Sequence, residues 1–183
     1  MRLAKVRNLK VWWLASALVA LILGGVLLLD FSSLRAPPAV FSGAVVSLPL
    51  LPHCHPVLNP QMQEGCTAQA GLRAMTLKMS GDVRPLRPFE LRLILPEAVR
   101  AHATEASVDF VMVGMDMGIN RYSLLKQQNG DFVGKVILPV CSIGRSDWLA
   151  KLSVVVNLPD GVTQEMWTAE MPFTAEASVV VHD

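Results

Sequence analysis

The feature that most constrains this chain is an uninterrupted apolar run close to its N-terminus. The 18 residues from Trp12 to Leu29 contain a single polar side chain, Ser16. Wound as an α-helix, they would extend roughly 27 Å, which approaches the roughly 30 Å thickness of a bilayer's hydrocarbon core. A cleaved secretory signal is the alternative. Its apolar region is usually shorter, about 7–15 residues, and it ends at a small-residue cleavage site that is not evident here. The sequence therefore favours one uncleaved transmembrane helix at 12–29.

The charges on either side of this run predict its orientation. Asp30 and a lone Arg35 follow the run, whereas four basic residues precede it: Arg2, Lys5, Arg7 and Lys10. Positive residues stay on the cytoplasmic side, so residues 1–11 are expected in the cytoplasm and the rest of the chain outside it. We therefore predict a single-pass protein of the bacterial inner membrane whose C-terminal domain is periplasmic.

The part of the chain beyond the anchor is close to neutral. Four of the 16 basic residues and one of the 15 acidic residues precede Phe31, which leaves a formal charge near −2 after it. No patch on such a segment could neutralise many phosphates, so nucleic acid is not an expected partner. The sequence also lacks a Gly-x-Ser-x-Gly elbow, a phosphate-binding glycine-rich loop and a His-Glu-x-x-His pair. We therefore expect a protein that is not an enzyme.

Proline content separates a lead-in from the domain that follows. Residues 30–70 hold six prolines, each of which lacks a backbone donor and fixes φ. This segment is predicted to be a stalk or an irregular lead-in, and residues 71–183 are predicted to form one periplasmic domain.

From about residue 72 onward, apolar residues alternate with polar ones, as in half-buried β-strands. The clearest cases are Met75, Leu77 and Met79, followed by the run from Phe89 to Leu95. Further strands are expected over 107–114, 120–125, 132–138, 149–158, 162–168 and 173–181. The segment 97–103 could form a short helical turn.

The turn signals between these strands complete the fold prediction. Asn129-Gly130 lies between two apolar runs and predicts a hairpin with positive φ at both positions. About seven short strands without a long helical period predict an all-β fold, specifically an antiparallel β-sandwich of immunoglobulin-like size.

Three methionines cluster at the end of one expected strand. Met112, Met115 and Met117 fall within six residues, beside glycines at 114 and 118 that permit a tight turn. Thioether sulfur is a soft, neutral donor that selects Cu(I) over zinc, magnesium or calcium. In a regular strand Met112 faces away from Met115, so it can join a site only if Gly114 breaks the extended geometry. The alternative is that these methionines fill irregular gaps in the core.

The cysteines and histidines offer a second candidate. His53-Cys54-His55 could ligate copper or zinc, and His102 precedes the strand that leads to the methionines. The alternative for the cysteines is a disulfide in an oxidising compartment. Three cysteines leave one over, and we expect the bond to include Cys66, paired with either Cys54 or Cys141.

A longer stretch around the methionines carries a resemblance to known proteins. Residues 110–122 read Phe-Val-Met-Val-Gly-Met-Asp-Met-Gly-Ile-Asn-Arg-Tyr, and Leu-Pro-Val-Cys at 138–141 and Gly-Arg-Ser-Asp-Trp at 144–148 follow the hairpin. Over roughly 72–156 the chain resembles the small anchored periplasmic proteins of the YtkA-like and FixH-like families. Those families share a methionine turn on an immunoglobulin-like sandwich and accompany copper-handling and oxidase-assembly proteins. The resemblance implies copper, as Cu(I), at Met112, Met115 and Met117.

The expected function follows from the anchor, the methionines and the resemblance together. We expect a tethered periplasmic protein that binds or delivers copper during assembly of a respiratory copper enzyme, cytochrome oxidase. Its expected partners are the inner membrane and Sco-type copper proteins or an oxidase subunit. The alternative is a metal-free interaction module in which the methionine turn is an apolar contact surface. Methionines converging on one exposed spot with a His or Cys nearby would favour copper, and methionines buried in separate directions would favour the module.

Overall fold

The computed structural model describes residues 41–57, 64–112, 114–115, 118–140 and 145–175. The chain divides into two compact units, Met1–Phe41 and Ser42–Asp183. The domain described below is the second unit. Within the described ranges no helix is both long and apolar enough to cross a bilayer, and the anchor predicted at 12–29 lies outside them.

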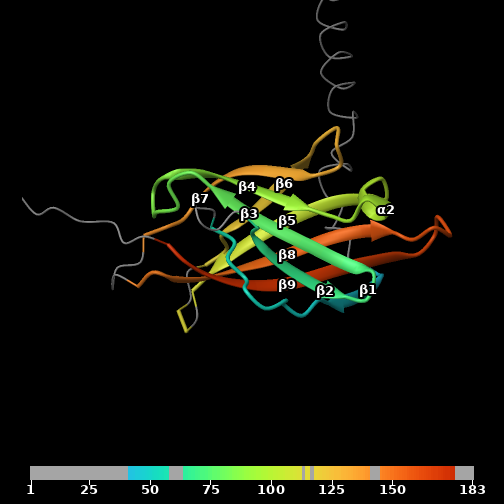
Figure 1. Cartoon of the computed structure of the whole chain (residues 1–183), viewed down its shortest axis with the longest axis horizontal. Coiled ribbons are helices and arrows are strands. Elements are labelled where there is room, and N and C mark those ends of the chain that lie inside the picture. The colour runs from blue at the N-terminus through green and yellow to red at the C-terminus, as the bar shows by residue number, and fades with distance from the viewer. Residues whose placement is uncertain (1–40, 58–63, 113, 116–117, 141–144, 176–183) are drawn as a thin grey trace, which may run out of the picture. The chain divides into compact units, whose positions relative to one another are not determined.

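Nine strands form one mixed sheet in the order β1-β9-β8-β5-β6-β7-β4-β3-β2, curled into a half-barrel (Figure 1). The strands are β1 (Ala44–Ser47), β2 (Cys66–Ala70), β3 (Arg73–Ser80), β4 (Pro88–Ile94), β5 (Ala103–Val111), β6 (Arg121–Lys126), β7 (Phe132–Ile137), β8 (Asp147–Asn157) and β9 (Gln164–Thr174). The helical turn expected near 97–103 is α2 (Glu97–Arg100). The predicted all-β class is confirmed. The last one or two strands, expected over 162–168 and 173–181, are the single strand β9, which ends at Thr174. Residues 176–181 lie outside the described ranges.

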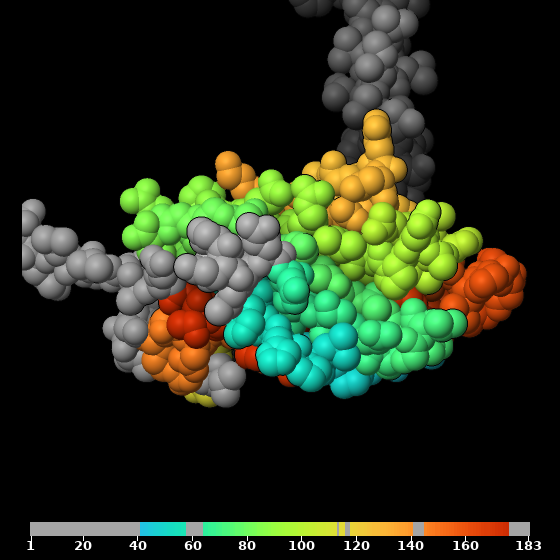
Figure 2. Space-filling model, in the orientation of Figure 1, coloured from blue at the N-terminus to red at the C-terminus, as the bar shows by residue number. Residues whose placement is uncertain are grey.

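One pairing differs from the antiparallel arrangement that the sequence predicted. β1 runs parallel to β9, whereas the other strand pairs of the sheet are antiparallel. The segment after β1 then leaves β9 for β2: the Leu51 amide donates to the Thr67 carbonyl, and the Gln69 amide donates to the Pro49 carbonyl, each at 2.8 Å. The segment thus crosses the open side of the half-barrel. Figure 2 shows residues 41–57 (cyan) lying against the green residues of β2 and β3.

Both β1 and β2 lie within residues 30–70, where the sequence predicted a stalk or irregular lead-in. Proline did not prevent these strands, because all six prolines lie outside them, before β1 or between β1 and β2, and because proline keeps its carbonyl acceptor. The buried Pro56, for example, accepts a bond of 2.6 Å from the Met79 amide. The sheet therefore begins well before residue 71.

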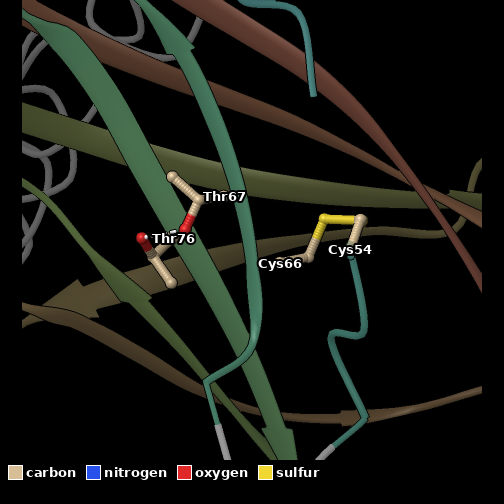
Figure 3. Close-up of a disulfide and its surroundings, with 4 residues drawn as sticks. All are labelled: Cys54, Cys66, Thr67 and Thr76. Carbon is tan, nitrogen blue, oxygen red and sulfur yellow. Dashed lines mark hydrogen bonds between the residues drawn. A yellow bond between two sulfur atoms is a disulfide. The ribbon is translucent and has the colours of Figure 1, made fainter. Parts of the chain in front are cut away.

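A disulfide joins Cys54 to Cys66, twelve residues apart (Figure 3). The expectation that Cys66 forms a disulfide is confirmed, and Cys54 is its partner. Cys66 is fully buried opposite Leu77 of β3, whereas Cys54 is half-buried in the lead-in. The bond therefore fastens the lead-in to the β2–β3 hairpin. Cys141 lies outside the described residues.

The core lies between the two halves of the curled sheet. The inward positions of β3 and β4 are fully or almost fully buried, as the alternation predicted: Met75, Leu77, Met79, Phe89, Leu91 and Leu93. The ring of Phe110 in β5 lies 6.1 Å from the ring of Phe89 in β4 and 5.9 Å from that of Phe173 in β9, measured between centroids. Because β4 and β5 are not neighbours in the sheet, the two halves pack face to face through these rings.

The loops gather at two ends of the domain (Figure 1). One end, called the α2 end below, carries α2, the β6–β7 turn and the β8–β9 turn. The chain leaves β3, β5 and β7 at the opposite end, called the methionine end because Met112 follows β5 there. The N-terminal side of β1 lies at the α2 end, since Ala44 pairs with Glu165 near the start of β9.

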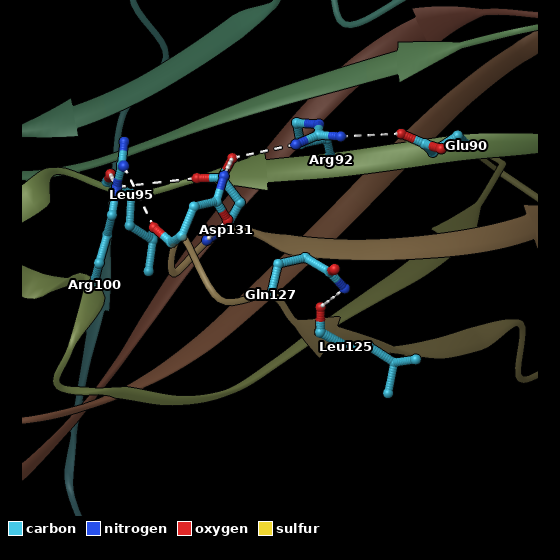
Figure 4. A network of polar contacts seen from close by, with 8 residues as sticks. Glu90, Arg92, Leu95, Arg100, Leu125, Gln127 and Asp131 are labelled. Atoms are coloured by element: carbon cyan, nitrogen blue, oxygen red, sulfur yellow. Dashed lines mark hydrogen bonds and ion pairs between the residues drawn. The ribbon is translucent and has the colours of Figure 1, made fainter.

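The Asn129-Gly130 hairpin forms, but with a different turn from the one predicted. Only Gly130 has a positive φ, 83°. Its amide donates to the Gln127 carbonyl at 2.9 Å, and the Gln127 amide donates to the Asp131 carbonyl at 2.7 Å. This is a longer hairpin loop that closes on a glycine bulge. The side chain of Asp131 is buried and accepts bonds from Asn129 at 2.9 Å and Arg92 at 3.4 Å (Figure 4).

Candidate functional site

Met112 and Met115 face each other across a tight turn at the methionine end. The Met115 amide donates to the Met112 carbonyl at 3.1 Å, and the two residues form an isolated antiparallel bridge. Gly114 makes this turn possible, because its φ of 77° lies in the left-handed region that a side chain disfavours. Residues bridged in this way have Cβ atoms about 5 Å apart on the same side of the backbone. Gly114 therefore breaks the extended geometry, which was the condition for Met112 to lie beside Met115.

The turn is joined to the hydrophobic core. Met112 is only 2% exposed and belongs to the core cluster, and Met115 is half-buried and packs against that cluster. Phe110, two residues earlier, makes an edge contact with Tyr122 at 6.1 Å between ring centroids. The two methionines therefore converge on one spot, but that spot is the margin of the core and not an exposed surface.

The third methionine of the predicted site, Met117, lies outside the described residues, as does Asp116. A Cu(I) site needs a third soft donor, because two thioethers alone bind weakly. The described part of the chain supplies two donors of the required chemistry and brings them together. The third ligand stays a prediction.

The structure separates His102 from the methionine turn. His102 immediately precedes β5 at the α2 end, and Met112 immediately follows the same strand. Nine strand residues at about 3.3 Å each place the two backbones roughly 30 Å apart. His102 therefore cannot complete a site with Met112, although the sequence places both on one strand.

The His53-Cys54-His55 candidate is changed by the disulfide. Cys54 is bonded to Cys66 and offers no thiolate in this state, while both histidines are exposed. Within the described ranges no three His, Cys, Asp or Glu side chains are placed to hold one metal ion. His53 has a positive φ of 63°, which is uncommon for a residue with a side chain.

An ion pair lies beside the methionine turn. A Cβ added to Gly114 would lie 4.0 Å from the Nη1 atom of Arg145, which places that guanidinium next to the turn. Arg145 Nε donates to Asp147 Oδ1 at 2.8 Å, and this bond lowers the pKa of the Asp147 carboxyl. The carboxylate therefore offsets the positive charge of Arg145 close to the methionines.

Exposed apolar side chains surround the methionine end. Leu86 is 67% exposed and has a positive φ of 60°, held by a bond of 2.9 Å from its amide to the Leu138 carbonyl. Ile119 is 91% exposed, and Ile137 and Val140 are about half exposed. A leucine held in a strained conformation with its side chain toward solvent is a feature that clusters at functional sites. Sequence reasoning missed Leu86, because only backbone φ distinguishes it from an ordinary loop leucine.

Comparisons of the chain with known protein families and with curated proteins found no match.

Proposed function

We propose that this chain is a periplasmic copper-binding or copper-delivery protein, tethered to the inner membrane, that assists assembly of a respiratory copper enzyme such as cytochrome oxidase. The observation that supports it best is the turn that places Met112 opposite Met115. Its donors are soft and neutral at every pH, as Cu(I) prefers. The anchor predicted at 12–29 supports attachment to the membrane. The family resemblance supports a role in oxidase assembly. The proposal involves no catalytic residue in the chain.

The proposal includes a finer description of the fold, an immunoglobulin-like sandwich. The tilted contact between Phe89 and Phe110 supports it, because these rings come from strands that do not pair. Tethering such a domain keeps it near a membrane client, which raises the effective concentration without a tight interface. Sco-type copper proteins or an oxidase subunit are the proposed partners.

The role of the chain's own residues is to hold and release copper as cargo. Met112, fixed in the core, would present one thioether from a rigid position, and Met115 would present a second from the turn. Met117 is the proposed third ligand. Bound Cu(I) supplies affinity for soft sulfur or nitrogen donors, which permits transfer to a client with a better donor set.

The test is a competition titration of the full-length chain, in mild detergent, against a Cu(I) chelator. Met115→Leu/Met117→Leu should weaken Cu(I) binding at least about tenfold, because leucine keeps volume but has no donor. The packing change should cost less than about 1.5 kcal/mol. Met79→Leu/Met171→Leu is the matched control, since both residues are fully buried on strands. It should leave copper affinity unchanged.

A second function is favoured by one observation, the burial of Met112 together with the exposed Leu86, Ile119 and Ile137. This would be a metal-free interaction module that docks an oxidase subunit or assembly factor through the methionine end. If the folded double variant binds Cu(I) as tightly as the wild type, the copper site is wrong and the module becomes the leading function. Leu86→Ser/Ile119→Ser should then weaken co-purification of the partner.

A further inference from the structure

The outward face of β1, β9, β8, β5 and β6 is ordered in rows of like chemistry. One row consists of hydroxyl side chains that lie directly opposite one another from strand to strand: Ser47, Thr168, Ser153, Ser107 and Ser123. Each hydroxyl can both donate and accept a hydrogen bond. The row can therefore form hydrogen bonds with donors or with acceptors on a facing surface.

The neighbouring row carries charges of alternating sign. Read across β9, β8, β5 and β6, its members are Glu170, Lys151, Asp109 and Arg121. Lys151 lies 3.1 Å from Glu170, and Arg121 lies 3.2 Å from Asp109. The two outer members, Glu170 and Arg121, have side chains 60% and 64% exposed. The row thus presents negative, positive, negative and positive charge in turn.

Apolar side chains flank these two polar rows. On one side lie Val111, Leu149 and Pro172. On the other lie Val155, Met166 and Val45, in a row that also holds the exposed Glu105 opposite Val155. A hollow of about 330 Å³ lies over the polar rows between them. Cross-strand ion pairs alone would stabilise the sheet, but they do not account for the apolar side chains on both sides, of which Val45 and Pro172 are exposed and the others half-buried.

This face is complementary to itself. Consider a two-fold axis that runs parallel to the strands, between β8 and β5. It places each row of one copy opposite the same row of the partner, with the strands in reverse order. Because a row of four alternating charges is opposite in sign to its reverse, Glu170 meets the partner's Arg121 and Lys151 meets the partner's Asp109. The same operation sets hydroxyls against hydroxyls and Val111 against the partner's Leu149. We infer that this face binds a second copy of the chain in an isologous dimer.

The size of the face sets the strength of this contact. The four strands that the axis relates, β9, β8, β5 and β6, lie about 4.8 Å apart, and with four rows about 7 Å apart they cover roughly 500 Å² on each copy. Two copies would bury roughly 1,000 Å², the lower limit for a specific interface, with the hollow filled by bridging water. The dimer is therefore reversible, and its charges govern specificity more than affinity. The inference does not depend on copper.

Charge reversal at the two most exposed positions tests the dimer. Glu170→Arg places arginine opposite the partner's Arg121 at both symmetric positions of the dimer. Arg121→Glu likewise places glutamate opposite the partner's Glu170 at both positions. Each variant alone should dimerise at least about tenfold more weakly than the wild type. An equimolar mixture should recover the dimer to within about threefold, because every facing pair is then opposite in sign.

The measurement uses full-length chains in mild detergent, with light scattering for mass and two affinity tags for mixed dimers. Lys135→Glu, an exposed reversal on β7 in the other half of the sheet, is the matched control and should dimerise like the wild type. Thermal unfolding checks that each variant is folded. A wild type that stays monomeric at about 100 μM, a dimer indifferent to both reversals, or folded variants that fail to recover on mixing would each overturn the inference.

Discussion

The α2 end and the methionine end both turn on a glycine of positive φ, but in opposite surroundings. At the α2 end, a Cβ added to Gly130 would lie 2.7 Å from the Cβ of Arg100. At the methionine end, among the described residues other than the chain neighbours, the heavy atom nearest to such a Cβ on Gly114 is 4.0 Å away. A glycine of positive φ therefore lies in a tightly packed turn at the α2 end and in a more open turn at the methionine end.

Polar contacts repeat the contrast. At the α2 end Glu165, which is 7% exposed, accepts two bonds from Arg73, at 2.6 and 2.8 Å, and one from the Trp167 indole at 2.8 Å. Arg73 belongs to β3 and Glu165 to β9, so this ion pair joins the two halves of the curled sheet. At the methionine end the Arg145–Asp147 pair joins residues only two apart in the chain, with side chains 37% and 53% exposed. The ion pair of the α2 end therefore joins the two halves of the sheet, whereas that of the methionine end is local and partly exposed.

The largest effect should come from breaking the ion pair of the α2 end. Glu165→Ala leaves the Arg73 guanidinium and the buried Trp167 indole without their acceptor, and we expect a loss of about 3 kcal/mol in unfolding free energy. Glu170→Ala on the same strand removes an exposed partner of Lys151 and should cost less than about 0.5 kcal/mol. Urea unfolding followed by tryptophan fluorescence measures both. Equal losses would show that Glu165 does not join the halves.

Acid should weaken the same contact. The hydrogen bonds from Arg73, and then that from Trp167, hold the pKa of the Glu165 carboxyl below its ordinary value of 4.5, against the opposing effect of burial. A carboxyl with a lowered folded pKa stabilises the fold above its unfolded pKa and loses that stabilisation as pH falls through the folded pKa. The stability difference between wild type and Glu165→Gln should therefore stay constant from pH 7 to about pH 5 and shrink below pH 4.5. A difference that persists at pH 3 would contradict the assignment.

Substitutions of the two glycines should have effects of intermediate size on the free energy of unfolding. Gly130→Ala adds both left-handed strain and the clash with Arg100, so it should cost about 2–3 kcal/mol. Gly114→Ala adds the strain alone and should cost about 1 kcal/mol. Thermal or urea unfolding of the two variants, compared directly, gives the difference between them. The open-turn description of the methionine end fails if Gly114→Ala is the more damaging change.

The smallest effect is expected at Leu86. Leu86→Gly removes left-handed strain from an exposed side chain, while glycine also loosens the unfolded chain, so stability should change by less than about 1 kcal/mol, toward greater stability. Gly71→Ala, at a positive φ of 61° with open space around it, is the opposite control and should destabilise. A clear loss of stability in Leu86→Gly would mean that the leucine packs within the domain and is not a contact residue.

Local pattern alone was enough for much of the fold. The alternation at Met75, Leu77 and Met79 predicted which side chains are buried, because a strand turns successive residues to opposite faces. A disulfide at Cys66 was predictable from the number of cysteines and from the oxidising compartment that the sequence predicts. The turn at Gly114 was predicted as the condition for Met112 to lie beside Met115. Each of these depends on residues that are near one another in the chain.

The tertiary structure decided what depends on pairing between distant segments. The lead-in supplies β1 and β2 because β9 and β3 offer edges to them, which no proline count reveals. His102 and Met112 stand at opposite ends of one strand, and Met112 is held in the core, because the strand's direction and the packing of its end are set by its neighbours. The alternating charges from Glu170 to Arg121 come from four separate strands. They form a row only once register is fixed, since a slip of one residue would turn each side chain to the other face.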